Sequence, residues 1–374
     1  MDDVKIDWCP IERIPDLQRL IDQHWRPGHI LSRDAELLRW QYRHLASDRH
    51  LAIMIAMDSA SGDLLGCLGF IQTPFDDRGT QRLALWMSMW LLVPEARGKG
   101  LGFALLDRVI KDGHEVIACV GFNDITKRLV SGLGFHIQDA MPRWVRPVSL
   151  PALLAVTEAR PEAYPQAIRD RWVAASVAVS ERPSELVRPW RTDDAALWDE
   201  AWASRLAGPL VATWHDAEYL AWRYLRHPSF TYRVHVTEGP DGSLRGLSVY
   251  RLEQIQGRAE RVLRLVELLG SGTALDALVA HALRTAREEG VAFVDFHCTA
   301  AGLLDVLEKH GFYRDDQEPP AHRLPLFFQP LDFRTKPLNF TLWVNGQVAP
   351  DVERFATENR LYFTRADGDQ DRPN

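Results

Sequence analysis

The sequence predicts an α/β (α+β) protein made of two similar domains in tandem, each with a mixed, mostly antiparallel sheet flanked by helices. Its 374 residues exceed one ordinary domain, and a hydrophobic fraction of 46% supports packed cores. An apolar stretch at 83–93, typical of a buried strand, leads through a glycine-rich turn into an amphipathic helix at 101–112. A segment of the first half also recurs in the second half, which indicates duplication.

The recurring segment is 34–42, which matches 216–224 in its Asp, Ala, Glu, Leu, Trp and Tyr residues at an offset of 182 (216 minus 34). The Gly-Phe pair at 134–135 recurs at 311–312, at an offset of 177 (311 minus 134). A nearly constant offset between separated matches favours a duplicated domain over chance. The second half also has the strand–helix–strand–helix order, at 262–269, 274–288, 291–296 and 303–310.

In the first half, the spacing of apolar residues predicts the individual elements. Ile14, Leu17, Leu20 and Ile21 share one face of a helix, and Asp34 can cap the next helix. The expected order is strand 4–8, helix 14–25, helix 34–44, strands 51–57, 64–71 and 83–93, helix 101–112, strand 115–120, a helix from 123 and a strand region at 135–145.

Composition shifts predict the domain boundaries. We expect an N-terminal domain at 1–146, a proline-punctuated linker at 147–187, a second domain at 188–328 and a tail at 329–374. The tail contains a strand at Phe340–Val344, and its polar end is expected to be solvated.

Composition also excludes several classes of function. A net charge of −7 argues against nucleic-acid binding, and no apolar run approaches membrane-spanning length. The four cysteines are scattered without metal-ligand spacing, and the N-terminus has no export signal. We therefore expect a cytoplasmic protein with reduced cysteines.

The turn after the long strand is suited to binding a pyrophosphate. Gly98, Gly100 and Gly102 let backbone N–H groups approach an anion at a helix N-terminus, and Arg97 and Lys99 add positive charge. The spacing fits neither a Walker loop nor a dinucleotide-binding fingerprint. A strand–turn–helix junction of some other α/β fold is the structural alternative.

This spacing resembles the Arg-x-x-Gly-x-Gly signature of the GNAT acyl-CoA N-acyltransferases, and 123–135 resembles the family's second signature, an Asn-led helix that ends in Leu-Gly-Phe. The resemblance implies acetyl-CoA or another acyl-CoA as co-substrate. The residues that it implies for acyl-CoA binding are Leu91, Leu92, Val93, Arg97, Gly98, Lys99, Gly100, Leu101, Gly102 and Asn123. Asn123 is equally well explained as a helix cap.

The resemblance further implies direct attack of a neutral amine on the thioester, whose carbonyl is polarised by a backbone N–H at a strand bulge near Trp90 to Leu92. Family members often carry a tyrosine seven residues after the asparagine, which donates a proton to the departing thiolate. This chain has Val130 there, which cannot donate a proton. Candidate catalytic groups are Ser88 on the long strand, His136 after the Gly-Phe pair, and Glu267 on the equivalent strand of the second copy. A surface role for His136 and a solvent-facing role for Glu267 are the alternatives.

The two copies differ at the turn. The second has Gly270-Ser271-Gly272-Thr273 without Arg or Lys, so we expect the first copy to bind acyl-CoA and the second to support it. The pairs Asp76-Asp77 and Asp193-Asp194 lie at turns or helix starts, and we predict no metal.

The acceptor is predicted to be a small-molecule primary amine. The tandem arrangement, the tryptophan-rich helices and the acidic C-terminal tail resemble those of acyltransferases of surface-polysaccharide biosynthesis. This resemblance favours an amino sugar or sugar nucleotide as the acceptor. Trp25, Trp40, Trp214 and Trp222 would suit sugar stacking, although core packing explains them as well. Amino-acid or polyamine acetylation, and an acyl-CoA sensor with vestigial chemistry, are the alternatives. The sequence leaves open whether the chain forms a homodimer.

Overall fold

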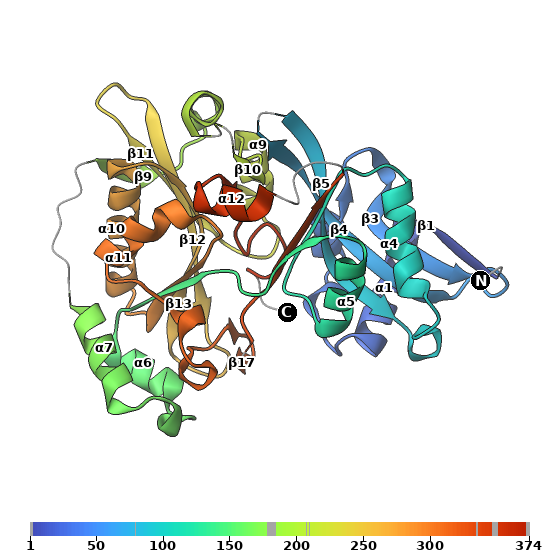
Figure 1. The fold of residues 1–374 in the computed structure, drawn as a ribbon, viewed down its shortest axis with the longest axis horizontal. Helices are drawn as coiled ribbons and strands as arrows, with labels where there is room; N and C mark the ends of the chain where they lie inside the picture. Colours follow the sequence, from blue (N-terminus) through green and yellow to red (C-terminus); the bar gives the residue numbers. More distant parts are fainter. Residues whose placement is uncertain are drawn as a thin grey trace.

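The computed structural model describes residues 3–78, 80–177, 185–206, 208, 210–333, 336–345 and 351–371. The chain folds into two halves that lie side by side, with its C-terminal end between them (Figure 1). Each half is built around a large mixed sheet, which confirms the predicted fold class. Among the described residues, the helices all fall short of the length and apolarity that a membrane span requires.

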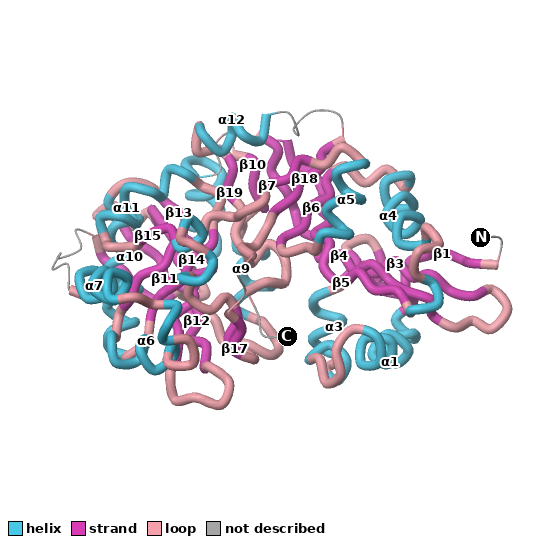
Figure 2. The backbone as a smooth tube through the Cα atoms, turned by 60° about the horizontal axis from the view of Figure 1, so that its bottom comes forward, coloured by secondary structure: helices cyan, strands magenta, loops and turns pink. Residues whose placement is uncertain are grey.

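The first half contains an antiparallel array β1-β3-β4-β5, after which β6 pairs with β5 in parallel. Alternate residues of these strands face opposite sides. α4 and α5 cover one side of the sheet, and α1 and α3 cover the other (Figure 2). The elements are β1 (Val4–Pro10), α1 (Ile14–His24), α2 (Ile30–Arg33), α3 (Ala35–Gln41), β2 (Arg43–His44), β3 (Ser47–Asp58), β4 (Leu64–Asp77), β5 (Thr80–Leu92), α4 (Leu101–Lys111), β6 (Val116–Val120), α5 (Asp124–Gly132) and β7 (His136–Gln138).

The second half repeats this order around β12 and β13, and β14 pairs with β13 in parallel. The elements that follow β7 in the chain are β8 (Arg143–Pro147), α6 (Leu150–Thr157), α7 (Gln166–Ser176), β9 (Leu186–Pro189), α8 (Asp194–Ala201), β10 (Val211–Thr213), α9 (Ala217–Leu220), β11 (Arg233–Glu238), β12 (Leu244–Gln254), β13 (Arg261–Gly270), α10 (Thr273–Glu288), β14 (Phe293–His297), α11 (Leu304–Lys309), β15 (Tyr313–Arg314), β16 (Phe327–Phe328), β17 (Leu331–Asp332), β18 (Phe340–Val344), α12 (Val352–Thr357) and β19 (Leu361–Tyr362). Of these, β10, β18 and β19 join the first sheet.

The two halves exchange their last strands. β8 follows the first half in sequence, but it lies between β14 and β15 in the second sheet. β18 follows the second half, and it lies between β6 and β7 in the first sheet (Figure 2). The pairing therefore departs from the predicted boundaries: the region 135–145 splits between the two sheets, and the tail contributes a central strand to the first sheet. Helices α6 and α7, in the predicted linker, pack on the second sheet.

The structure shows the duplication at the repeated segment. Asp34 caps α3 by accepting a hydrogen bond from the N–H of Leu37, and Asp216 caps α9 by accepting one from Tyr219, each at 2.8 Å. The equivalent residues Trp40 and Trp222 meet where the halves touch, and each indole N–H donates to the other's backbone carbonyl, at 3.2 and 3.4 Å. The contact is therefore reciprocal, with the same residue of each copy in the same role.

Residues 361–368 and Asp371 are buried and 369–370 are half-buried, contrary to the prediction that the polar end of the tail is solvated; residues 372–374 lie outside the described residues. The carboxylate of Asp371 accepts hydrogen bonds from Arg223 at 3.1 Å and from the hydroxyl of Tyr232 at 2.6 Å. The guanidinium of Arg223 also donates to the carbonyls of Ala366 and Gly368. These hydrogen bonds replace contacts with water for the polar groups that make them.

Candidate functional site

A gap opens between β5 and β6 beyond their last paired residues. The two strands pair from Ala84 with Val116 to Met87 with Cys119, and β5 then continues to Leu92 without this neighbour. On its other side, β5 carries a bulge where Gly69 of β4 faces both Ser88 and Met89. The bulge therefore lies before the Trp90–Leu92 position that we predicted, directly at the start of the gap. A bulge turns backbone groups out of the ladder, which leaves them available to a ligand.

Tight packing behind the bulge fixes its place. A Cβ atom on Gly69 would lie 2.6 Å from the ring of Tyr42, so only glycine fits there. The hydroxyl of Ser88 donates to the hydroxyl of the buried Tyr42 at 3.0 Å and approaches the carbonyl of Gly69 at 3.4 Å. Sequence reasoning missed Tyr42 as the partner of Ser88, although Tyr42 belongs to the repeated segment.

The glycine turn, Arg97–Gly102, follows β5 as predicted. Gly98 and Gly100 have φ angles of +74° and +77°, and Gly100 is the N-cap of α4. The N–H groups of the first turn of α4 have no partners within the helix, and the turn is exposed. The guanidinium of Arg97 donates to the carbonyl of Leu92 at 3.1 Å, so it is held beside the end of β5. Within the described part of the chain, Arg97 and Lys99 make no ion pair, and their charges are available to an anion.

A cleft of about 500 Å³, called here the first cleft, occupies the gap between β5 and β6. It brings residues of the first half together with residues of the buried tail. The lining residues are Trp25, Met87, Ser88, Trp90, Cys119, Gly121, Phe122, Asn123, Asp124, Thr126, Leu326, Lys336, Pro337, Leu338, Asn339, Asp369 and Gln370.

Of the predicted site residues outside the turn, Ser88 and Asn123 line this cleft. Asn123 also caps α5, because its side-chain oxygen accepts a hydrogen bond from the N–H of Thr126 at 2.9 Å. The cap that we gave as the alternative is therefore present, and the residue faces the cleft as well. His136 is half-buried on β7 and is absent from the lining; burial lowers its pKa.

Glu267 is fully buried and lies in the second half, contrary to the solvent-facing alternative. Its carboxylate accepts hydrogen bonds from the hydroxyls of Tyr224 at 2.6 Å and Tyr362 at 2.8 Å, and Nε2 of His215 lies 3.2 Å away. A carboxylate enclosed in this way has no route to a substrate in the first cleft.

The tail fills the gap in the second half that corresponds to the first cleft. β13 pairs with β14 only from Leu263 to Leu265, and Val266 forms a bulge against β12. The hydroxyl of Tyr362 accepts a hydrogen bond from the backbone N–H of Leu268 at 3.0 Å, and the backbone of Phe363 pairs with Thr299 beside it. The second copy thus has the same strand geometry, but its own chain occupies the space.

The turn of the second copy is also occupied. Thr273, the first residue of α10, donates its hydroxyl to the carboxylate of Glu185. A negatively charged side chain therefore lies at the helix N-terminus, where an anion would otherwise be stabilised. This contact and the missing cations give a physical reason for the predicted difference between the copies.

The tail places a carboxylate in the first cleft that sequence reasoning missed. Asp369 is half-buried and accepts a hydrogen bond from the side chain of Gln370 at 2.7 Å. Burial, and after it the charge of Asp369, raises the pKa of the Cys119 thiol, which places this carboxylate near the last paired residue of β6. No local pattern indicated this role, because Asp369 lies in a polar run that reads as solvated.

The other predicted groups serve structural purposes. Of the four tryptophans proposed for the acceptor, Trp25 lines the first cleft, whereas Trp40 and Trp222 pack between the halves and Trp214 packs on Trp202. Asp77 pairs with Arg78 and Arg82, and Asp194 pairs with Arg188. Among the residues that the structure describes, no three His, Cys, Asp or Glu side chains form a group that could hold a metal ion.

Comparison with known proteins agrees with this geometry. Residues 14–135 match the model of the Acetyltransferase (GNAT) family, a range that includes the glycine turn and ends with the second signature. No curated protein matches the chain.

Solved structures show the same fold over most of the chain. N-myristoyltransferase from Saccharomyces cerevisiae with bound myristoyl-CoA aligns with a TM-score of 0.54 at 12% identity, over 92% of this chain and 79% of that one. A GCN5-related N-acetyltransferase from Anabaena variabilis aligns with a TM-score of 0.57 at 12% identity, over 91% and 72%. A probable N-acyltransferase from Enterococcus faecalis aligns with a TM-score of 0.52 at 11% identity, over 78% and 64%.

The fold is thus one that N-acyltransferases adopt, and the first cleft lies within the half that matches the GNAT family model. The match to the GNAT acetyltransferase family lies in residues 14–135 of the N-terminal half, and the chain as a whole shares the fold of these N-acyltransferase structures.

Proposed function

We propose that this chain transfers an acetyl or similar acyl group from coenzyme A to a small-molecule primary amine in the first cleft. The observation that carries the proposal is that the glycine turn, the bulge at Ser88–Met89 and the carboxylate of Asp369 all adjoin the gap between β5 and β6. The turn supplies N–H groups and two cations for the pyrophosphate, and the gap leaves room for the pantetheine arm.

Each chemical step then has a group beside it. Asp369 accepts a proton from the acceptor ammonium, directly or through a water molecule, which frees the nitrogen lone pair. The nitrogen attacks the thioester carbon, and a backbone N–H at the bulge stabilises the negative charge that develops on the carbonyl oxygen. The C–N bond forms and the C–S bond breaks; the nitrogen loses its remaining extra proton as it becomes the amide, and the departing thiolate of coenzyme A takes up that proton, directly or through water. Asp369 here replaces Glu267 and His136 as the favoured base, because it lies in the cleft.

The acceptor predicted from the sequence, an amino sugar or sugar nucleotide of polysaccharide biosynthesis, belongs to this proposal. Trp25 supports it, because its indole lines the first cleft and can stack on a sugar ring. The other three tryptophans no longer support it. Amino acids and polyamines are therefore tested beside amino sugars.

Two measurements test the proposal. Calorimetric titration with acetyl-CoA should show binding to the wild-type protein and to Arg39→Glu, a control on the exposed side of α3, but weak binding to Arg97→Glu. Release of free thiol should then be followed with a panel of amines. Asp369→Asn should bind acetyl-CoA normally and lower kcat by about 10² or more, the usual contribution of a general base.

One outcome would favour an acyl-CoA sensor instead. Val130, at the position where family members often carry the acidic tyrosine, is fully buried in the core of the first half. If acetyl-CoA bound tightly but no amine released coenzyme A, the transfer would be ruled out and the sensor supported. Undiminished binding by Arg97→Glu would contradict both.

A further inference from the structure

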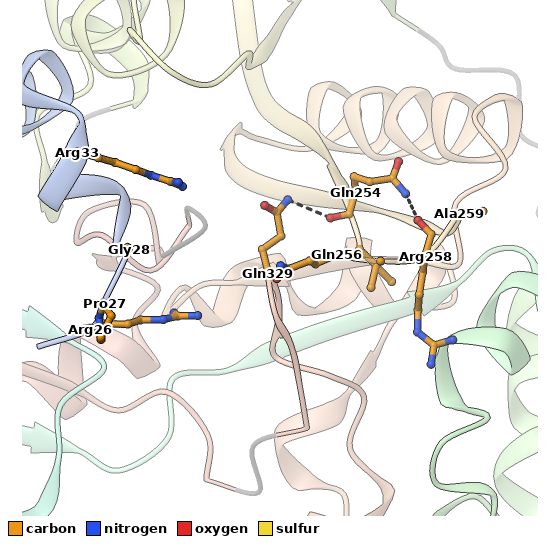
Figure 3. Close-up of a pocket in the computed structure, with 11 residues that line it drawn as sticks. Arg26, Pro27, Gly28, Arg33, Gln254, Gln256, Arg258, Ala259 and Gln329 are labelled. Atoms are coloured by element: carbon orange, nitrogen blue, oxygen red, sulfur yellow. Dashed lines mark hydrogen bonds between the residues drawn. The ribbon is translucent and has the colours of Figure 1, made fainter. Parts of the chain in front are cut away.

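A second hollow lies between the two halves beside the first cleft. Its volume is about 770 Å³, and the loop between α1 and α2 forms one wall (Figure 3). The hairpin between β12 and β13, with Gln329, forms the opposite wall. We call this hollow the arginine pocket. Its lining residues are Arg26, Pro27, Gly28, Arg33, 254–259 and Gln329.

The charge of this pocket is opposite to that of the protein. Its lining contains three arginines and no carboxylate, in a chain of net charge −7. Arg258 is neutralised by Glu158 at 2.7 Å, but the guanidinium groups of Arg26 and Arg33 form no hydrogen bond or ion pair with any residue that the structure describes. Both side chains extend across the hollow toward the hairpin (Figure 3). Two uncompensated positive charges therefore face the same space.

The loop that carries Arg26 and leads into α2, which carries Arg33, is held in place. The carboxylate of Asp22 accepts hydrogen bonds from the N–H of Gly28 at 2.7 Å and the hydroxyl of Ser32 at 3.1 Å. Gly28 has a φ angle of +70°, which favours glycine at this turn. Burial, and then the positive charges of Arg26 and Arg33, lowers the pKa of His29 to about 4. The neutral imidazole of His29 thus lies close to the guanidinium groups of both Arg26 and Arg33, so these two positive charges are near each other.

The arginine pocket continues from the first cleft. Trp25 lines the first cleft and its neighbour Arg26 lines the arginine pocket. On the opposite side, Leu326 lines the first cleft and Gln329 lines the arginine pocket. Two segments from different halves therefore pass from one hollow to the other. A molecule that occupies both hollows would have one end near Ser88 and Asp369 and the other end near the two arginines.

We propose that the arginine pocket binds an anionic group, a phosphate or a carboxylate, carried by the acceptor at the end remote from its amine. The proposal rests on acyl transfer in the first cleft and narrows its acceptor to acidic amines. Guanidinium groups bind phosphate and carboxylate through paired, charge-assisted hydrogen bonds. The side-chain amides of Gln254, Gln256 and Gln329 add polar groups to the opposite wall. A simple polyamine, which carries only positive charge, would be repelled.

Matched pairs of acceptors test this proposal and distinguish the two anions. Glucosamine 6-phosphate is compared with glucosamine, and 6-aminohexanoate with hexylamine. The wild-type enzyme should prefer the acidic member of at least one pair in kcat/KM, and the preference should weaken with added salt. In the double variant Arg26→Gln/Arg33→Gln, the ratio of kcat/KM for the acidic acceptor to that for the neutral one should fall about tenfold. This factor corresponds to the free energy of one hydrogen bond to a charged group. Arg39→Gln should keep the wild-type preference. Equal kcat/KM within both pairs, or an unchanged preference in the double variant, would overturn the proposal.

A binding measurement separates this proposal from the transfer reaction itself. Pyrophosphate is titrated into Arg97→Gln protein, in which the glycine turn is weakened, and into the same protein with Arg26→Gln and Arg33→Gln added. Loss of binding on adding the two substitutions would support the anion site even if no amine were acylated. Equal binding by the two proteins would overturn it.

Discussion

The buried carboxylate of Asp367 gives a stability prediction whose sign and size follow from its surroundings. Burial, and next the charge of Glu267, raises the pKa of Asp367 from 3.8 to about 7. The group also faces His215, and it accepts hydrogen bonds from the hydroxyl of Thr213 at 2.5 Å and the N–H of Thr364 at 2.6 Å. These contacts oppose the rise in pKa but do not cancel it.

The sign follows from proton binding. The folded pKa is above the unfolded pKa, so between about pH 4 and pH 7 the folded protein holds a proton that the unfolded chain has lost. The contribution of Asp367 to the free energy of unfolding is therefore complete below about pH 4 and falls as pH rises to about 7. A shift of about three pH units corresponds to at most about 4 kcal/mol.

The variant Asp367→Asn removes the charge and keeps the shape. Its amide oxygen can accept from Thr364, and its NH₂ group can donate to the hydroxyl of Thr213. We expect Asp367→Asn to gain stability relative to the wild type as pH rises, by up to about 4 kcal/mol between pH 4 and pH 8. At pH 4 the two proteins should differ by about 1 kcal/mol or less, the value of one altered hydrogen bond.

Urea unfolding at pH 4, 5, 6, 7 and 8 measures this difference. Glu267 and His215 are present in both proteins, so their own titration largely cancels. Asp139→Asn is the control, because 73% of the Asp139 side chain is exposed, and its difference from the wild type should change little with pH. A pH-independent difference for Asp367→Asn would refute the view that burial holds this carboxyl protonated near neutrality.

Two further predictions concern the turn and the exchanged strand. Gly100→Ala should lower the free energy of unfolding by about 1 kcal/mol and weaken acetyl-CoA binding, because the backbone at Gly100 has a φ angle of +77°, although no atom crowds the new methyl group. Gly132→Ala in α5 is equally uncrowded and should cause neither loss. Thermal melts measure the stability, and calorimetry measures the binding. Arg143→Met should cost about 3–5 kcal/mol in urea unfolding, because it removes the guanidinium that pairs with the buried carboxylates of Asp295 and Asp315 at 3.2 and 2.8 Å and leaves the charge of Asp315 without an ion-pair partner among the described residues. Arg39→Met should cost little, and equal losses in the two variants would contradict a structural role for Arg143.

The sequence predicts well the features that depend on neighbouring residues. The glycine turn needs positive φ angles at Gly98 and Gly100, and only glycine adopts these freely, so its position is visible in the sequence. The caps at Asp34 and Asp216 depend on an N–H three residues away, and the repeat shows both. The strand Phe340–Val344 was also predicted correctly.

The sequence does not show which distant strands pair. A short strand at 143–147 fits either sheet, and its place between β14 and β15 is set by contacts more than 140 residues away, such as Arg143 with Asp295. The bulge was misplaced for a related reason. Its position depends on the pairing of Gly69 with β5, and that depends on the space that Tyr42 leaves. The role of Asp369 requires the path of the whole tail.

That path suggests why a second copy without an open cleft is retained. Tyr362 and Phe363 occupy the gap of the second half, and Asp367 and Asp371 pair with groups of that half. These contacts fix the chain on both sides of Asp369, which then lies in the first cleft. The second copy therefore binds the tail in the gap that corresponds to the first cleft, and under the proposed function it thereby positions a carboxylate for the first copy. Because β18 also completes the first sheet, folding of the first cleft depends on the second half, and we expect the two halves to unfold together.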